Sequence, residues 1–121
     1  MLKLLASAAF GALLLSVLPL GLRAEPTAAP LLPAVLTVHI RNFAFHPSSA
    51  TIHRGDRVTF VNDDSDAHTV TAADRSFDSG GLDTGDHWQH VFERSGTFAY
   101  FCALHPYMKA TLVVAPIGAN P

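Results

Sequence analysis

A period of two governs the apolar residues of this chain from Val35 onward. In VLTVHIR (35–41), Leu36, Val38 and Ile40 alternate with polar residues, as a half-buried strand requires. Similar segments follow between turns rich in Gly, Asp, Asn and Ser, namely RVTFVN, HTVTA, WQHVFE, TFAYFC and KATLVV. Six or seven short strands and no convincing helical stretch predict an all-β fold, an antiparallel Greek-key β-sandwich with a core of Val, Ile, Leu and Phe.

One long connection, residues 73–86, interrupts this regular spacing. It is rich in Gly and Asp but contains Phe77 and Leu82. We expect these two side chains to hold an otherwise irregular loop against the sandwich.

Residues 1–24 have the pattern of a secretory signal peptide. Lys3 precedes an uncharged apolar run, Pro19 and Gly21 break that run near its end, and Ala24 offers a small residue for cleavage. The alternative is an uncleaved membrane anchor, because the run is nearly long enough to span a bilayer. We therefore predict an exported protein, periplasmic after cleavage, with a membrane-anchored form as the alternative.

The segment EPTAAPLLPA, residues 25–34, reads as a Pro/Ala-rich linker, followed by a domain at 35–116 and a tail at 117–121. Without Lys3 and Arg23, six of the eight basic residues remain against ten acidic ones, so the net charge moves from −2 to −4. A mildly acidic domain is poorly suited to nucleic acid, whose binding depends on Lys and Arg. We expect a monomer that binds no nucleic acid and, in its mature form, no membrane.

The chain has a single cysteine, Cys102, in the segment YFCALHPYM. An unpaired cysteine in an exported protein is a buried inert side chain, an intermolecular bridge, a catalytic nucleophile or a metal ligand. His105 and Met108 follow at successive steps of three, so thiolate, imidazole and thioether lie in one short segment. This soft set favours copper over zinc. A trigonal copper site with a weak axial Met needs a second histidine, and His68 is the best candidate.

These motifs resemble those of the type I (blue) copper proteins, the cupredoxins. The resemblance runs from Val58 to Val114, and the Cys-x2-His-x2-Met spacing is similar to the short ligand loop of amicyanin rather than the longer loops of plastocyanin and azurin. It implies a cupredoxin sandwich and one copper ion that alternates between Cu(I) and Cu(II). The ligands that it implies are His68, Cys102, His105 and Met108.

Two positions depart from the family pattern. Thr69 stands where plastocyanin and amicyanin have an Asn whose side chain braces the ligand loops, and Ala110 stands where a Gly is common after the Met. Neither departure removes a ligand. The first bears on how the site is held in place.

The function predicted from this resemblance is one-electron transfer between redox partner proteins. We expect partners to dock on the apolar surface of Leu104, Pro106 and Tyr107, beside the edge of His105. The alternative is a periplasmic copper carrier or scavenger with the same ligands, which would release its metal to a chelator.

An enzyme is the less favoured interpretation. A nucleophilic Cys–His pair would lack a third orienting group and an oxyanion-hole motif, and Met108 would have no role. The triplet DTG at Asp83–Gly85 is shared with aspartic proteases but does not follow an apolar strand.

The remaining histidines and the acidic turn before His68 are predicted to be surface features. The turn, with Asp63, Asp64 and Asp66, lacks the Gly and closing Glu of a calcium loop, so we expect it to be solvated. The histidines expected at the surface are His39, His46, His53, His87 and His90.

Overall fold

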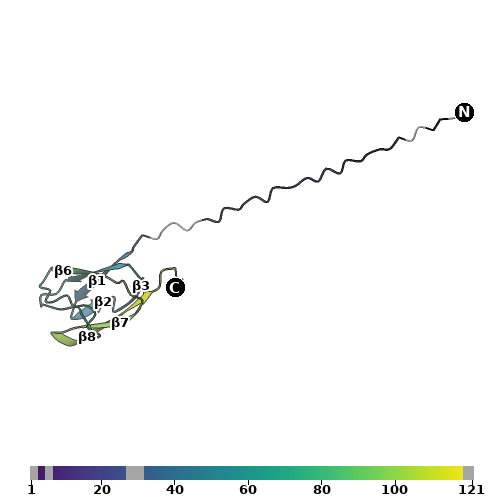
Figure 1. The fold of residues 1–121 in the computed structure, drawn as a ribbon. Helices are drawn as coiled ribbons and strands as arrows, with labels where there is room; N and C mark the ends of the chain where they lie inside the picture. Colours follow the sequence, from purple (N-terminus) through teal and green to yellow (C-terminus); the bar gives the residue numbers. More distant parts are fainter. Residues whose placement is uncertain (1–2, 5–6, 27–31, 119–121) are drawn as a thin grey trace.

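The computed structural model describes residues 3–4, 7–26 and 32–118, and all of its strands lie in one sandwich (Figure 1). No helix occurs in these described ranges. The strands are β1 (Val35–Arg41), β2 (Ala44–His46), β3 (Ser49–His53), β4 (Arg57–Asn62), β5 (Thr71–Ala72), β6 (His87–Val91), β7 (Gly96–Cys102) and β8 (His105–Ala115).

Two four-stranded sheets form the sandwich, with the orders β2-β1-β4-β6 and β3-β8-β7-β5. The predicted all-β sandwich is therefore confirmed, but its strictly antiparallel arrangement is wrong. Two of the six strand pairings, β1 with β4 and β3 with β8, are parallel. The reason is that the chain passes from one sheet to the other after β2, β3, β4, β5 and β6. When the chain forms a strand in the opposite sheet before it returns, the returning strand can run parallel to an earlier strand of its own sheet.

The core forms because both sheets present their apolar alternation inward. In β1, Val38 and Ile40 are buried between partly exposed neighbours, and Phe60 of β4 lies beside Val38 in the parallel register. Phe60 is fully buried, so its truncation to Ala would cost about 3–5 kcal/mol of unfolding free energy. Phe77 and Leu82 are also buried, which confirms that they hold the long connection against the core.

The sequence located some strands better than others. β4 has the predicted bounds, whereas only two residues of HTVTA, Thr71 and Ala72, form a strand. β2 and β3 were not predicted. β8 begins at His105, several residues before KATLVV, because the ligand-bearing segment itself pairs with β7.

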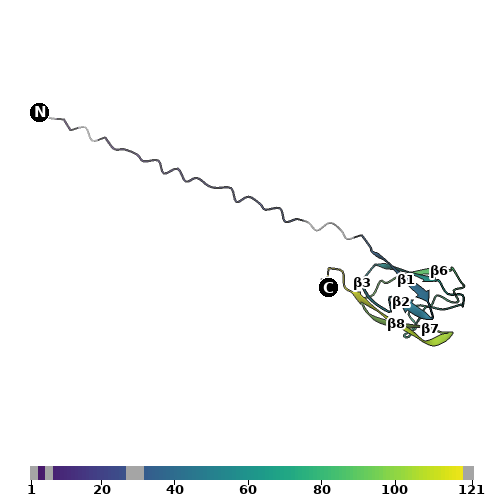
Figure 2. The ribbon, with the colours of Figure 1, turned by 180° about the vertical axis from the view of Figure 1, so that it is seen from behind.

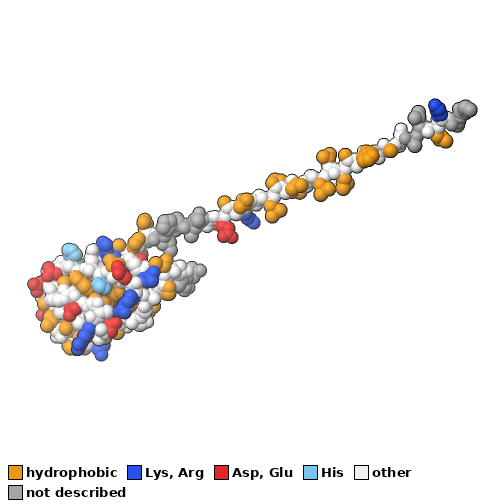
Figure 3. Space-filling view, viewed as in Figure 1, with side chains coloured by type: hydrophobic (Ala, Val, Ile, Leu, Met, Phe, Trp, Pro, Cys, Tyr) orange, Lys and Arg blue, Asp and Glu red, His pale blue; other side chains and the backbone are white. Residues whose placement is uncertain are grey.

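The described residues before the domain form no strand and no part of the core. Residues 7–26 run away from the sandwich as one extended segment (Figure 2), and its large apolar side chains are exposed. Figure 3 shows these apolar side chains along the segment. On the visible face of the domain, acidic and basic side chains are mixed with one another. Among the residues described, no helix is long and apolar enough to cross a membrane.

The predicted signal peptide stays a prediction. The linker is described only at 25–26 and 32–34, and the predicted tail only at 117–118. The other residues of both segments lie outside the described ranges.

Candidate metal centre

Cys102 and His105 lie at the closed end of the β7–β8 hairpin. Cys102 ends β7, His105 begins β8, and the two residues pair across a turn that contains only Ala103 and Leu104. The register shifts between Phe101 and Cys102, so the last residue of β7 is displaced from the regular ladder. The thiol is fully buried.

His68 reaches the same place from the connection between β4 and β5. Its backbone exchanges two hydrogen bonds with Leu82, His68 N to Leu82 O at 3.0 Å and Leu82 N to His68 O at 2.7 Å. The buried Asn62 holds both segments, because its Nδ2 donates to Asp66 O at 2.8 Å and to Leu82 O at 2.9 Å. The acidic turn and the long connection together fix His68, whose side chain is fully buried.

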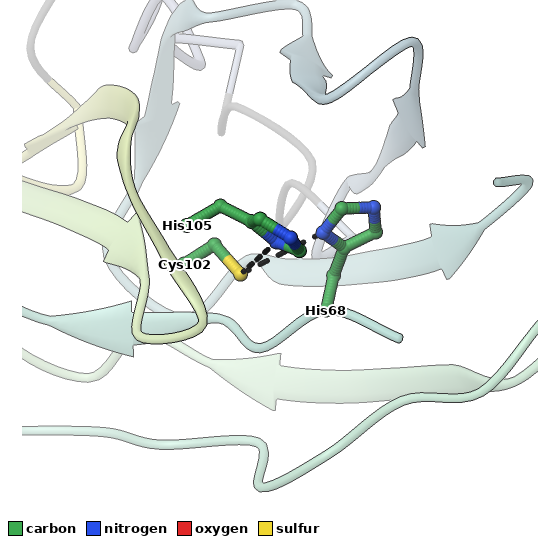
Figure 4. Close-up of side chains that lie close together, drawn as sticks. All are labelled: His68, Cys102 and His105. Carbon is green, nitrogen blue, oxygen red and sulfur yellow. Dashed lines mark hydrogen bonds between the residues drawn. The ribbon is translucent and has the colours of Figure 1, made fainter. Parts of the chain in front are cut away.

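The two imidazoles converge on the thiol (Figure 4). Nδ1 of His68 and Nδ1 of His105 each lie 3.6 Å from Cys102 Sγ, and the three potential ligand atoms lie within 4.8 Å of one another. Within the described part of the chain, no other group of three His, Cys, Asp or Glu residues meets this criterion.

This donor set has the spacing that a bound metal ion requires. Bonds of about 2.0 Å to imidazole nitrogen and about 2.3 Å to thiolate, at trigonal to tetrahedral angles, separate nitrogen from sulfur by about 3.5–3.7 Å. Both observed separations, 3.6 Å, fall in that range. A buried thiol with two imidazoles is also the soft and borderline chemistry that copper prefers.

Met108 follows His105 on β8. Its side chain is buried and shares the inward face of the strand with Ala110 and Leu112. A thioether from this strand is the donor type expected for a weak axial position. Its role as a ligand stays a prediction.

Asp64 makes a contact that the sequence did not predict. Its Oδ2 accepts a hydrogen bond from His68 Nε2 at 2.9 Å, and its two oxygens accept from the N–H groups of Asn42 (2.6 Å) and Phe43 (2.9 Å). Burial would raise the pKa of the Asp64 carboxyl, but the bonds from Phe43, Asn42 and His68 outweigh it and lower that pKa. An ionised carboxylate can only accept, so Nε2 of His68 donates this bond, and the other ring nitrogen, Nδ1, faces the thiol.

Thr69 braces the ligand segments through both its backbone and its side chain. Its N–H donates to Cys102 Sγ at 3.3 Å, and its Oγ1 accepts from Ala103 N at 2.7 Å. This side-chain bond ties the segment after His68 to the turn between Cys102 and His105. The threonine that departs from the family pattern therefore still connects the two ligand-bearing segments.

Most of the histidines and acidic-turn residues that were predicted to lie at the surface are not part of this cluster. The prediction that the acidic turn is solvated is wrong for Asp64, because this residue accepts a hydrogen bond from the buried His68. His39 Nδ1 lies 2.6 Å from Asp63 Oδ2, and His46 Nε2 donates to Arg41 O at 3.2 Å. His87 is exposed, as predicted.

His90 is half-buried instead of fully at the surface. It stacks on Trp88 with ring centroids 5.3 Å apart, and its ring contacts Phe77 and Phe92. Burial lowers the pKa of His90, and the nearby charge of Glu93 only partly opposes this. The ring therefore belongs to an aromatic cluster at the side of the sandwich.

Together, the sandwich, the His–Cys–His cluster and a buried Met108 on the strand that His105 begins define the site of a type I copper protein. A sequence model of the Cupredoxin-like domain family matches residues 11–114, and the chain belongs to this family. No match was found among curated proteins.

Solved structures agree with this assignment. A novel purple cupredoxin from Nitrosopumilus maritimus is 31% identical, with a TM-score of 0.63, over 66% of this chain and 99% of that one. The copper-containing nitrite reductase NirK from Thermus scotoductus SA-01 is 28% identical, with a TM-score of 0.64, over 81% of this chain but 26% of that one. An amicyanin variant is similar in fold, with 21% identity and a TM-score of 0.62 over 65% of this chain and 80% of that one.

Proposed function

We propose that this protein is a small exported, periplasmic copper protein that carries single electrons between redox partner proteins. The observation that carries the proposal is the convergence of Cys102 Sγ with one nitrogen each of His68 and His105, all within 4.8 Å. His68 and Cys102 are fully buried, so the site excludes water around two of its donors.

His68 Nδ1, Cys102 Sγ and His105 Nδ1 would hold the copper, and the Met108 thioether would supply a fourth, weaker donor. When bound, copper would supply a Cu(I)/Cu(II) couple for one electron. The protein's own contribution is rigidity. Asp64 fixes the ring of His68, and Thr69 fixes the turn between Cys102 and His105. A donor set held in this way changes little between the two oxidation states, which favours rapid electron exchange.

We infer that partner proteins dock around His105. This imidazole is half-buried, and Leu104 and Tyr107 beside it are 57% and 69% exposed, with Pro106 between them also exposed. A small apolar surface suits a weak, transient redox encounter. The variants Leu104→Asp and Tyr107→Asp should slow electron exchange with a partner protein, and unchanged rates would contradict this docking site.

The likeness to NirK does not favour catalysis, because this chain corresponds to only 26% of that reductase. Transfer of electrons also requires only the one metal centre described above. The rival role of copper carriage uses the same donors and is separated from electron transfer by whether the metal stays bound through repeated reduction and oxidation.

The first test is a visible spectrum of the purified protein titrated with Cu(II). We expect an intense blue or purple thiolate-to-copper band that saturates at one equivalent and is absent from Cys102→Ser. His87→Gln, which changes an exposed histidine outside the cluster, is the matched control and should keep the band. A colourless protein, or equal copper binding without Cys102, would refute the proposal.

A further inference from the structure

The turn between β1 and β2 carries an aromatic residue in an unfavourable backbone conformation. Arg41 pairs with Ala44, which leaves Asn42 and Phe43 as a two-residue turn with φ of 52° and 55°. Such a hairpin turn favours Asn followed by Gly, because both positions need positive φ. Phe is costly in the left-handed region, so hairpin closure alone does not account for Phe43.

The ring of Phe43 lies against both imidazoles of the metal centre. Its centroid is 5.4 Å from that of His68 and 5.1 Å from that of His105, with interplanar angles of 85° and 86°. Phe43 is 38% exposed, whereas His68, which it contacts, and Cys102, which His68 contacts, are 0% exposed. The ring therefore lies between solvent and the nitrogen–sulfur cluster.

One carboxylate fixes this ring relative to the metal centre. Asp64 accepts hydrogen bonds from the N–H groups of Asn42 and Phe43 as well as from His68 Nε2. Because the same group anchors the turn and orients His68, the turn cannot move away while these bonds persist. The unfavourable conformation of Phe43 is thus stabilised by bonds to the residue that also positions His68.

We propose that Phe43 is a capping residue of the metal centre, which positions the two imidazoles and denies small external ligands and thiol reagents access to the site. This inference rests on the proposed copper function and extends it. The ligands that it excludes are small anions such as azide and small electrophiles such as iodoacetamide, which would otherwise reach copper or the Cys102 thiol from the side of the turn.

The test compares Phe43→Gly with the wild type and with Tyr107→Ala. Gly suits a φ of 55°, so the hairpin is expected to form and the urea midpoint of unfolding to stay near that of the wild type. Tyr107 is the matched control, because it is a more exposed aromatic residue whose ring lies 6.1 Å from that of His105.

The first readout needs no metal and is the rate at which iodoacetamide alkylates Cys102 in the folded apoprotein. Loss of two edge-to-face ring contacts should raise this rate at least about tenfold in Phe43→Gly, and Tyr107→Ala should stay within about twofold of wild type. The second readout is azide binding to the copper-loaded protein, seen as a shift of the visible band in Phe43→Gly only.

Alkylation and azide binding at wild-type levels in a folded Phe43→Gly variant would overturn the capping role and leave the copper function intact. If the wild type binds no copper, the proposed function fails, while the alkylation rates still decide whether Phe43 covers the thiol. Should Phe43→Gly lose its fold, Phe43→Asn provides the same comparison, because Asn also tolerates the left-handed region.

Discussion

Thr69→Val removes the hydroxyl group that links the two ligand-bearing segments and keeps the shape of the side chain. Thr69 Oγ1 accepts from Ala103 N at 2.7 Å and shares a 2.9 Å hydrogen bond with Thr71 Oγ1. Thr71 Oγ1 in turn donates to Asp78 Oδ1 at 3.3 Å, so the proton of Thr69 points to Thr71. The substitution therefore deletes one acceptor and one donor of a single chain of bonds.

The expected cost follows from what each lost bond leaves behind. The N–H of Ala103 is only partly accessible and loses its acceptor, which costs about 1–2 kcal/mol. The bond between the two hydroxyl groups is also part-buried and contributes about 0.5–1 kcal/mol. We expect Thr69→Val to lower the unfolding free energy of the apoprotein by about 2 kcal/mol. Copper affinity should fall by about tenfold or more, because partners that orient ligands typically contribute that much.

Urea unfolding of the apoprotein, with m unchanged, measures the first effect, and competition with a copper chelator measures the second. Thr69→Ser keeps the hydroxyl and should recover most of both losses. Thr71→Val breaks only the outer links and should cost less than Thr69→Val. A loss below about 0.5 kcal/mol, or no recovery with Ser, would refute the bracing role of the Thr69 hydroxyl.

Two further substitutions test the surroundings of the site and of the aromatic cluster. Asp64→Ala leaves Nε2 of the buried His68 without its acceptor and should lower the unfolding free energy by about 2–4 kcal/mol in urea. The control is Asp66→Ala, which makes the same charge change at an exposed residue of that turn. An equal loss of unfolding free energy in the two variants would contradict the role of Asp64 as the acceptor that holds His68. His90 has a folded-state pKa below its ordinary 6.5, so the unfolded chain takes up the proton first and stability falls as the pH drops from about 6.5 through that folded value. His90→Gln should show a smaller loss of melting temperature between about pH 7.5 and pH 5 than the wild type, and an unchanged pH dependence would show that burial of His90 does not control it.

Local geometry explains what the sequence predicted well. The alternation in VLTVHIR and RVTFVN predicts which side chains face the core, because successive residues of a strand point to opposite faces. The spacing of Cys102, His105 and Met108 is likewise local, since a single hairpin end carries all three residues. For this reason the fold class and that half of the site could be predicted from the sequence alone.

His68 was an intermediate case. The need for a second imidazole singled it out, but its neighbours in the sequence do not place it near Cys102. Only the backbone bonds to Leu82 and the buried amide of Asn62 bring it within 3.6 Å of the thiol.

Tertiary structure alone decided which groups hold and cover the site. The parallel pairings of β1 with β4 and β3 with β8 depend on passages between the two sheets that no local pattern encodes. The contacts of Asp64 with the β1–β2 turn, of Thr69 with Ala103 and of Phe43 with both imidazoles join residues more than twenty positions apart. A sequence specifies the period and the turn chemistry of each segment, whereas the distance between two remote segments is set by how all the segments pack together.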